Sequence, residues 1–323
     1  TSTTVPSNNN IADNSAIVVD TSAPTISSFS SSTSDGSYNV GDTINITATA
    51  SESIQSGNTL TVTLDTGDTV VLTAASAGTT LTGTYTVGAG DTSSDLTVSS
   101  FTIGTVADTA GNAMTSTTVP SNNNIADNSA IVVDTSAPTL SSSSPADDAT
   151  AVAVGSNIVL NFSEAVDVES GDIVIYKTSD NSVIETIAVG SGQVTGTGTT
   201  QITINPSSDL ASSTQYYVQI AATGFDDTAG NSYAGITNTT SLSFTTAAPS
   251  LSINDVSYTE TSSASNATFT VTLSEASGQD VTVDYASSDV STTAGSDYTT
   301  TSGTVTIAAG NTTATINVPI LVD

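Results

Sequence analysis

Apolar and polar residues alternate strictly along many short segments of this chain. Thr, Asn or Gln fills most positions between the apolar ones, and Gly, Asp, Ser and Asn separate the segments. Alternation with a period of two and many β-branched residues is typical of half-buried β-strands. The clearest segments are Ile44, Ile46 and Ala48; Leu60, Val62 and Leu64; Ile158, Leu160 and Phe162; Tyr216, Val218 and Ile220; Phe269, Val271 and Leu273; and Ile316, Val318 and Ile320. Because no segment shows a helical period, the pattern predicts an all-β protein of tandem β-sandwiches arranged end to end.

One stretch of 25 residues occurs twice. The sequence TSTTVPSNNNIADNSAIVVDTSAPT begins at Thr1 and returns letter for letter at Thr115, an offset of 114 residues. A period of this size corresponds to a whole domain rather than to one turn of a solenoid. We therefore interpret residues 1–20 as the C-terminal strand region of a preceding repeat, and the chain as a section of a longer array.

Segments in which Pro follows small polar residues mark the predicted domain boundaries, because such segments suit short, stiff linkers. DTSAPT occurs at residues 20–25 and 134–139, and TTAAPS occurs at residues 245–250. These linkers predict one domain at residues 21–134, a second at 135–247 and an incomplete third at 248–323.

The charge of the chain limits its partners. One Lys and no Arg stand against 31 Asp and Glu, which gives a net charge of −30. Such a chain repels phosphate backbones and anionic membrane surfaces, and no apolar run is long enough to cross a bilayer, so we expect neither nucleic acid binding nor membrane insertion. Repulsion among the carboxylates also opposes folding unless counter-ions neutralise them, which is a first argument for a divalent cation.

The chain has neither His nor Cys. This composition excludes disulfides, the usual zinc ligands and nucleophiles activated by His. Two carboxylates acting as acid and base, as in glycosidases, remain compatible with it. The carboxylates are predicted at sandwich ends next to linkers, where the sequence indicates no cleft. We therefore do not expect an enzyme.

Counting strands places acidic loops at common ends of the sandwiches, since alternate loops emerge at alternate ends. The entrance of domain 21–134 should gather Asp20, Glu52, Asp108 and Asn112; its opposite end Asp42, Asp91 and Asp95; and the entrance of domain 135–247 Asp134, Glu164, Asp226, Asp227 and Asn231. Ca²⁺ prefers six to eight oxygen ligands in flexible geometry, which such loops offer. The pentapeptide DTAGN lies in both entrances, at 108–112 and 227–231. The alternative is that these Asp and Asn side chains only close turns.

Longer motifs carry a resemblance to known domains. Domain 21–134, with YTVGAGDTSSDLTV and VADTAGNAM, resembles the Ig-like repeats of giant bacterial surface adhesins of the biofilm-associated and RTX type. Domain 135–247, with SSSPADDATAVAVGSNIVLNFSEAV and DDTAGNSY, resembles the Ig-like domain first recognised in S-layer proteins. Domain 248–323, with LSINDVSYTE and AGSDYTTTSGTVTIAAG, resembles a Calx-β domain that breaks off before its last strands.

The resemblance implies an extracellular protein at a bacterial cell surface that binds Ca²⁺. In domain 248–323, the positions that match the acidic calcium ligands of Calx-β domains are Glu260, Asp297 and Asp323, and the rest of that acidic cluster falls beyond Asp323. We expect a calcium-stiffened stalk segment of a surface adhesin, with calcium ions and neighbouring repeats as partners.

The main alternative is a self-assembling subunit of an extracellular filament, sheath or S-layer, with identical chains as partners. In such an assembly, a strand from a neighbour could complete a sandwich by β-strand addition. A third class, direct binding of glycan or ice, requires a flat or concave specific surface. The Thr alternation is compatible with such a surface, but ordinary strands explain it.

Overall fold

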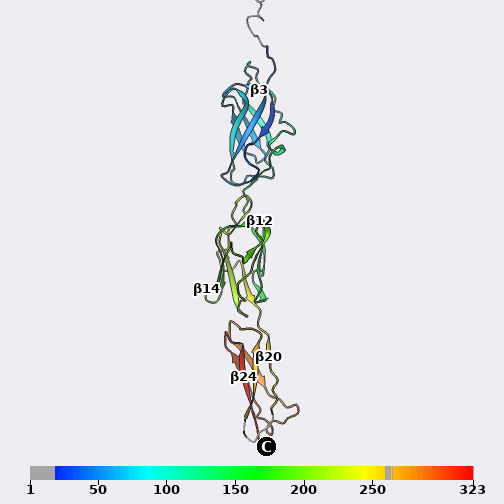
Figure 1. The fold of residues 1–323 in the computed structure, drawn as a ribbon, viewed down its shortest axis with the longest axis vertical. Helices are drawn as coiled ribbons and strands as arrows, with labels where there is room; N and C mark the ends of the chain where they lie inside the picture. The colour runs from blue at the N-terminus through cyan, green and yellow to red at the C-terminus, as the bar shows by residue number, and fades with distance from the viewer. Residues whose placement is uncertain (1–18, 259–262, 264, 323) are drawn as a thin grey trace, which may run out of the picture. The chain divides into compact units, whose positions relative to one another are not determined.

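The computed structural model describes residues 19–258, 263 and 265–322. Strands make up nearly all of its regular structure, which confirms the predicted all-β fold class (Figure 1). The chain divides into two compact units, unit 1 with Thr1–Ser136 and Ala229–Asn231, and unit 2 with Ala137–Thr228 and Ser232–Asp323. The three predicted boundaries stay predictions, as does the interpretation of residues 1–20, of which 1–18 lie outside the described residues.

Unit 1 contains two sheets and a short 3-10 helix. Its elements are β1 (Ile26–Ser30), β2 (Gly36–Tyr38), β3 (Thr43–Ile54), β4 (Thr59–Leu64), β5 (Thr69–Thr73), β6 (Gly78–Thr86), β7 (Thr92–Ser93), β8 (Val98–Thr105), η1 (Ile125–Asp127) and β9 (Ile131–Asp134). The larger sheet has the order β1-β3-β6-β5-β4-β8. The smaller has the order β2-β9-β7, in which β9 is central and runs parallel to β2.

The core of unit 1 follows from the alternating pattern. In β3, Ile44, Ile46 and Ala48 are fully buried, while the polar residues between them are partly exposed. Ile131 and Val133 of β9 belong to the same buried cluster, although β9 lies in the other sheet. Both sheets therefore enclose one core, as expected for a sandwich.

A reciprocal pair of hydrogen bonds fastens the linker before β1 to strand β3. The backbone N–H of Thr25 donates to Ser51 Oγ over 3.0 Å, and the N–H of Ser51 donates to the Thr25 carbonyl over 2.8 Å. We call this pair the linker latch. It holds the linker beside the end of β3, next to Glu52.

In its described part, unit 2 has more strands than unit 1, and all but one of its sheets are antiparallel. Its strands are β10 (Leu140–Ser144), β11 (Ala149–Val152), β12 (Ile158–Val168), β13 (Asp172–Lys177), β14 (Ser182–Ala188), β15 (Val194–Thr195), β16 (Thr199–Ile204), β17 (Gln215–Ile220), β18 (Phe225–Asp226), β19 (Ser243–Thr246), β20 (Leu251–Ile253), β21 (Ser265–Leu273), β22 (Val281–Ala286), β23 (Ser302–Ile307) and β24 (Thr313–Ile320). The exception is the sheet β11-β19-β17-β13-β14, in which β11 runs parallel to β19.

The described residues of unit 2 form two separate hydrophobic clusters. The first joins the sheet β10-β12-β16-β15, with β18 beside β12, to the sheet β11-β19-β17-β13-β14. The second joins Val271 and Ile316, from the sheet β20-β21-β24, to Ile307 of the hairpin β22-β23. Two clusters indicate two sandwiches, because each sandwich buries its own inward faces.

The linker latch recurs at the start of both sandwiches of unit 2. The N–H of Thr139 donates to Ser163 Oγ over 3.0 Å, and the N–H of Ser163 returns a 2.9 Å bond to the Thr139 carbonyl. Ser250 and Ser274 repeat the pair with the same two distances, 3.0 and 2.9 Å. A Glu follows the latch Ser each time, at positions 52, 164 and 275. The latch is therefore a shared way of attaching a linker to the sandwich that follows it.

Candidate metal centre

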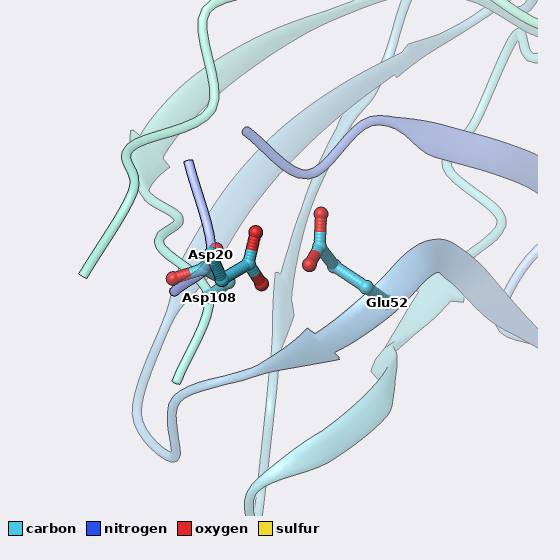
Figure 2. Close-up of side chains that lie close together, drawn as sticks. All are labelled: Asp20, Glu52 and Asp108. Atoms are coloured by element: carbon cyan, nitrogen blue, oxygen red, sulfur yellow. The ribbon is translucent and has the colours of Figure 1, made fainter. Parts of the chain in front are cut away.

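Three carboxylates meet at the linker side of unit 1. Asp20 comes from the linker, Glu52 from β3, and Asp108 from the loop after β8. One carboxylate oxygen from each lies within 4.8 Å of the other two. Figure 2 shows the Glu52 carboxylate turned toward those of Asp20 and Asp108. The structure thus brings together three of the residues predicted for this entrance, and we call them the linker carboxylates.

The turn DTAGN positions the buried member of this group. Asp108 is only 1% exposed, and its two carboxylate oxygens accept hydrogen bonds from the backbone N–H and the side-chain amide of Asn112, over 2.8 and 2.7 Å. The turn closes through Gly111, whose φ of +98° lies in the left-handed region that favours glycine. Asp108 also forms a β-bridge with Ile54, which sets the turn against β3.

Asn112, the fourth predicted residue, ties the turn to the linker. Besides its bond to Asp108, its side-chain amide donates to the backbone carbonyl of Asp20 over 3.1 Å. Asp20 in turn accepts a hydrogen bond from the N–H of Ser22 over 3.0 Å. The linker is therefore positioned twice, by the latch at Thr25 and by Asn112 at Asp20.

The protonation behaviour of the linker carboxylates differs between members. Partial burial, and then the negative charges of Asp20 and Asp108, raise the pKa of Glu52 above its ordinary value of 4.5. Burial alone would raise the pKa of Asp108, but hydrogen bonds from Asn112 and from the backbone of the turn outweigh it and lower that pKa below 3.8. Asp108 is held ionised, whereas the charged form of Glu52 is destabilised by the negative charges of Asp20 and Asp108.

The opposite end of unit 1 uses its acids differently. Asp91 Oδ2 accepts hydrogen bonds from the Tyr85 hydroxyl over 2.6 Å and from the Gly88 N–H over 2.7 Å. Asp42 Oδ2 accepts one from the Asn39 N–H over 2.9 Å. Within the described residues, the carboxylates of Asp42, Asp91 and Asp95 do not gather as those of the linker do.

Asp91 has a different acidic neighbour, Asp68. Partial burial, with the charge and hydrogen bond of Asp91, raises the pKa of Asp68. Burial and the hydrogen bond to Asp91 likewise raise the pKa of Tyr85. No sequence pattern marks this contact, since it depends on which turns face each other across the sheet.

The residues predicted for the second entrance belong to both units. Asp134 and Asn231 lie in unit 1, where the Asn231 amide donates to the Asp134 carbonyl over 2.9 Å. Asp134 also accepts a hydrogen bond from the Ser136 N–H over 2.9 Å. These two bonds repeat those that Asp20 makes in the other copy of the linker.

Glu164, Asp226 and Asp227 lie in unit 2. Glu164 follows the latch residue Ser163 in β12, and Asp227 is buried. The Oδ1 atom of Asp226 is buried without a hydrogen-bond partner. Because the expected site joins residues of both units, its assembly stays a prediction.

The site predicted for domain 248–323 is described only in part. Glu260 and Asp323 lie outside the described residues. Asp297 Oδ2 accepts a hydrogen bond from the Thr293 N–H over 2.6 Å, and its backbone carbonyl accepts one from Leu321 over 3.0 Å. Asp297 therefore joins a turn to the chain just after β24. A cavity of about 820 Å³ beside it is lined mainly by apolar residues of this sandwich, and among the described residues Asp297 is the one carboxylate in its lining.

Two family models match the chain. The bacterial Ig-like domain matches residues 134–246, and the Calx-beta domain matches residues 245–323. The chain contains both domains. Domains of these kinds are typical of extracellular or surface proteins, are compatible with an adhesion-type role and are typically non-catalytic, and Calx-beta domains are generally associated with calcium binding.

The other comparisons add little. No curated protein matches the chain. Among solved structures, a marsupial T cell receptor matches with 10% sequence identity, covering 92% of this chain and 93% of that one. Its TM-score is 0.30, so this likeness supports no further statement. Within the described residues, no helix has the length and apolar character needed to cross a membrane.

Proposed function

We propose that this chain is a calcium-stiffened extracellular stalk segment of a repetitive bacterial surface adhesin. In cell adhesion and biofilm formation, the stalk would hold a distal binding domain at a distance from the cell. The observation that carries the proposal is the group of linker carboxylates. It joins a linker residue, Asp20, to two residues of the following sandwich, Glu52 and Asp108. A cation bound there would fix the linker to the sandwich.

Ca²⁺ fits the chemistry of this group. Every donor is an oxygen, which suits a hard cation, and the three carboxylates come from separate segments that adjust to a flexible coordination shell. Lys177 is the sole basic residue of the chain, so no ion pair within unit 1 neutralises the group. Asp20, Glu52 and Asp108 would hold the ion, and Asn112 would keep the linker and the turn in register.

The second linker supports a second site of the same kind. Asp134, Glu164, Asp227 and Asn231 repeat the residue types and order of Asp20, Glu52, Asp108 and Asn112. The hydrogen bonds of Asp134 and the latch at Ser163 match their counterparts closely. The unpartnered Oδ1 of Asp226 adds a buried oxygen that calls for an ion or a water.

The mechanical role follows from the position of the sites on linkers. Domains joined by flexible linkers move relative to each other unless their interface is large. An ion held by the linker and the sandwich restricts that motion, so that a chain of such domains keeps a distal binding domain away from the cell. This role involves calcium ions and neighbouring repeats as partners, and no catalysis.

The proposal is tested on the whole chain by calorimetric unfolding and small-angle scattering, with millimolar Ca²⁺ and with excess chelator. An ion that binds only the folded state stabilises it by about 2.7 kcal/mol at a hundredfold excess over the dissociation constant. We expect Ca²⁺ to raise the unfolding temperature and the extension of the chain. Glu52→Gln should reduce the rise in unfolding temperature that Ca²⁺ causes.

Asp95→Asn is the matched control, because Asp95 is also an acid of unit 1 but lies outside the linker carboxylates. It should keep the full response to Ca²⁺. The proposal fails if Ca²⁺ changes neither the unfolding temperature nor the extension, or if both variants respond alike.

A second candidate function is a self-assembling subunit of an extracellular filament, sheath or S-layer. One observation favours it. Val19 is 82% exposed, whereas Val133, its counterpart in the repeated 25 residues, is 2% exposed within the core of unit 1. An apolar side chain with a known place in this fold is thus available for contact with another chain.

A further inference from the structure

We propose that the two sandwiches of unit 2 are docked directly on each other, through a contact that needs no metal ion. The first sandwich contains β10–β19 and the second contains β20–β24. The contact joins residues 211–214, just before β17, to residues 274–280, the loop between β21 and β22. We call it the loop contact. It holds whether or not the linker carboxylates of unit 1 bind Ca²⁺.

The linker between these two sandwiches lacks the acid that the other linkers provide. TTAAPS at residues 245–250 takes the place of DTSAPT, so that Thr245 stands where the other linkers have Asp20 and Asp134. Glu275 follows the latch Ser as in the other latches, but it belongs to no group of three carboxylates among the described residues. An ion held in the way proposed for unit 1 therefore has no linker carboxylate here.

Backbone groups of the two loops meet directly. The N–H of Gly278 donates to the Ser212 carbonyl over 3.0 Å, and Ser212 and Ser277 form a parallel β-bridge. Ser212 is 0% exposed and Ser277 is 3% exposed, although both lie in loops, which normally run over the surface. The groups of this contact are uncharged, so the contact adds no repulsion in a chain with a net charge of −30.

Hydrogen bonds hold the first loop on its own sandwich. The N–H of Thr214 donates to Thr246 Oγ1 over 3.0 Å, and Thr214 Oγ1 donates to the Ser212 carbonyl over 2.9 Å. Thr246 Oγ1 also donates to the Ala211 carbonyl over 2.7 Å. Ser213 has a φ of +51°, which a residue other than glycine keeps only where its surroundings impose it. The loop therefore presents the Ser212 carbonyl in a fixed position.

The second loop is fixed at both of its ends. The Ser277 carbonyl accepts a hydrogen bond from the Gly310 N–H over 3.0 Å, and Ser277 Oγ accepts one from the Gln279 N–H over 3.1 Å. Ser274, at the start of the same loop, forms the linker latch with Ser250. One loop of the second sandwich thus holds both the linker and the first sandwich.

The linker leaves little freedom between these attachments. The N–H of Ala247 donates to the Val152 carbonyl over 2.7 Å, which ties this end of the linker to the first sandwich. The latch fastens Ser250 to the second sandwich, so that Ala248 and Pro249 lie between the two ties, and Pro fixes its own φ. Sandwiches joined by a short linker and also by the loop contact cannot swing as domains on one flexible linker do.

Gly278 is needed because no side chain fits at its position. Its φ lies outside the left-handed region, so the backbone alone does not require glycine. A Cβ atom there would overlap Thr214 Oγ1, which the hydrogen bond to the Ser212 carbonyl holds in place. The next atoms, the Ser212 carbonyl oxygen and Thr214 Cβ, would both be at 3.4 Å, an ordinary contact distance. One added methyl group should therefore break the contact, and removal of one hydroxyl should restore it.

The test measures the distance between the two sandwiches in the whole chain. The chain has no Cys, so Thr186→Cys in β14 and Thr306→Cys in β23, both exposed, place one nitroxide label on each sandwich. Pulsed electron paramagnetic resonance gives the distribution of label distances. Labels at Thr186→Cys and Ser141→Cys, both in the first sandwich, give the width due to the labels themselves.

We expect the distribution between the sandwiches to be about as narrow as this reference, and to be the same in millimolar Ca²⁺ and in excess chelator. A broad distribution in chelator would overturn the proposal. If Ca²⁺ fails to stabilise the chain, the expectation is unchanged, because no group of the loop contact is a proposed calcium ligand. The two proposals can therefore fail separately.

Two substitutions test the contact itself. Gly278→Ala should broaden the distribution, because its methyl group pushes the loops apart. Gly190→Ala is the matched control, since a Cβ atom at this position of the first sandwich would have no neighbour within 4 Å, and it should leave the distribution unchanged. Thr214→Ala/Gly278→Ala should restore the narrow distribution. An unchanged distribution in Gly278→Ala, or an equally broad one in the double variant, would overturn the proposal.

Calorimetry separates a broken contact from a damaged sandwich. Gly278 lies outside both hydrophobic clusters of unit 2, so Gly278→Ala should leave both sandwiches folded. If this variant unfolded the second sandwich instead, the width measured for the parent chain in chelator would still decide.

Discussion

At the linker side of unit 1, three carboxylates from separate segments lie within 4.8 Å of one another, whereas at the opposite end Asp91 accepts hydrogen bonds from Tyr85 and Gly88. Both ends are acidic in sequence. Donors reach acids at both ends, as Asn112 does for Asp108 and Tyr85 for Asp91. The ends differ in how the carboxylates are arranged, because among the described residues only those at the linker side gather in a group of three. The number of acids at an end therefore does not predict whether their side chains come together.

The largest expected effect comes from Asp108→Ala. This change removes the acceptor for both Asn112 donors inside a buried turn, and leaving buried donors unsatisfied costs about 1–3 kcal/mol. The unfolding free energy of unit 1 should fall by that amount in chelator, and the response to Ca²⁺ should be lost. Asp108→Asn, which keeps one of the two acceptor oxygens, should lose less stability in chelator than Asp108→Ala and should also lose the calcium response. Equal losses in chelator for the two variants would contradict this account.

Tyr85→Phe should have an intermediate effect. It deletes the 2.6 Å hydrogen bond to Asp91, and a bond to a charged acceptor contributes about 1.5–3 kcal/mol when its partner is left without compensation. Chemical denaturation should therefore show a loss near the lower limit, since Asp91 keeps its bond to Gly88. The calcium response should be unchanged. A reduced calcium response would mean that the two ends are coupled.

A smaller effect is the pH dependence of stability, which should differ between two of the linker carboxylates, Glu52 and Asp108. Because the folded-state pKa of Glu52 is raised above 4.5, acidification toward that pKa protonates Glu52 and relieves its repulsion, so the calcium-free protein gains stability there. The stability from Asp108, whose pKa is lowered, is present above pH 3.8 and is lost only as the pH falls through its folded value.

As the pH falls, the stabilisation by Ca²⁺ should therefore be lost before the stabilisation that the turn gains from ionised Asp108. The rise in unfolding temperature caused by Ca²⁺ should shrink as the pH falls from 7 toward the raised pKa of Glu52, since protons compete for a ligand. Glu52→Gln should remove this pH dependence. A calcium effect that stays constant as the pH falls through the pKa of Glu52 would exclude Glu52 as a ligand.

Asp42→Asn should have the smallest effect. The amide oxygen can still accept the hydrogen bond from the Asn39 N–H, so we expect a change within about 0.5 kcal/mol in unfolding free energy and no change in the calcium response. Isothermal titration with Ca²⁺ would check the second point. A weaker calcium affinity in this variant would show that the opposite end binds an ion after all.

The strands of this protein could be predicted because their signal is local. The alternation at Ile44, Ile46 and Ala48 recurs as alternating burial in β3, and the same holds for Leu60, Val62 and Leu64 in β4. The meeting of Asp20 with Glu52 and Asp108 could also be predicted, since loops on alternate strands share an end of the sandwich. Strand order alone is enough for that inference.

The opposite end could not be predicted, because its contacts depend on distances that strand order does not contain. Asp91 turns toward Tyr85 and Asp68 rather than toward Asp42 and Asp95. The position of a Tyr within a strand does not indicate which side chain its hydroxyl will contact. The linker latch was missed for the same reason, although the Ser-Glu pairs at 51–52, 163–164 and 274–275 are a signal that could have found it.

The linker latch has a consequence for how such a chain can evolve. At Thr25, Thr139 and Ser250 the linker is fastened to the sandwich that follows it, by backbone groups and one Ser hydroxyl of that same sandwich. Each latch thus uses only groups of the linker and of the sandwich that follows it. Recombination between repeats can then insert, delete or reorder whole domains, and even join an Ig-like domain to a Calx-beta domain, while every latch is kept.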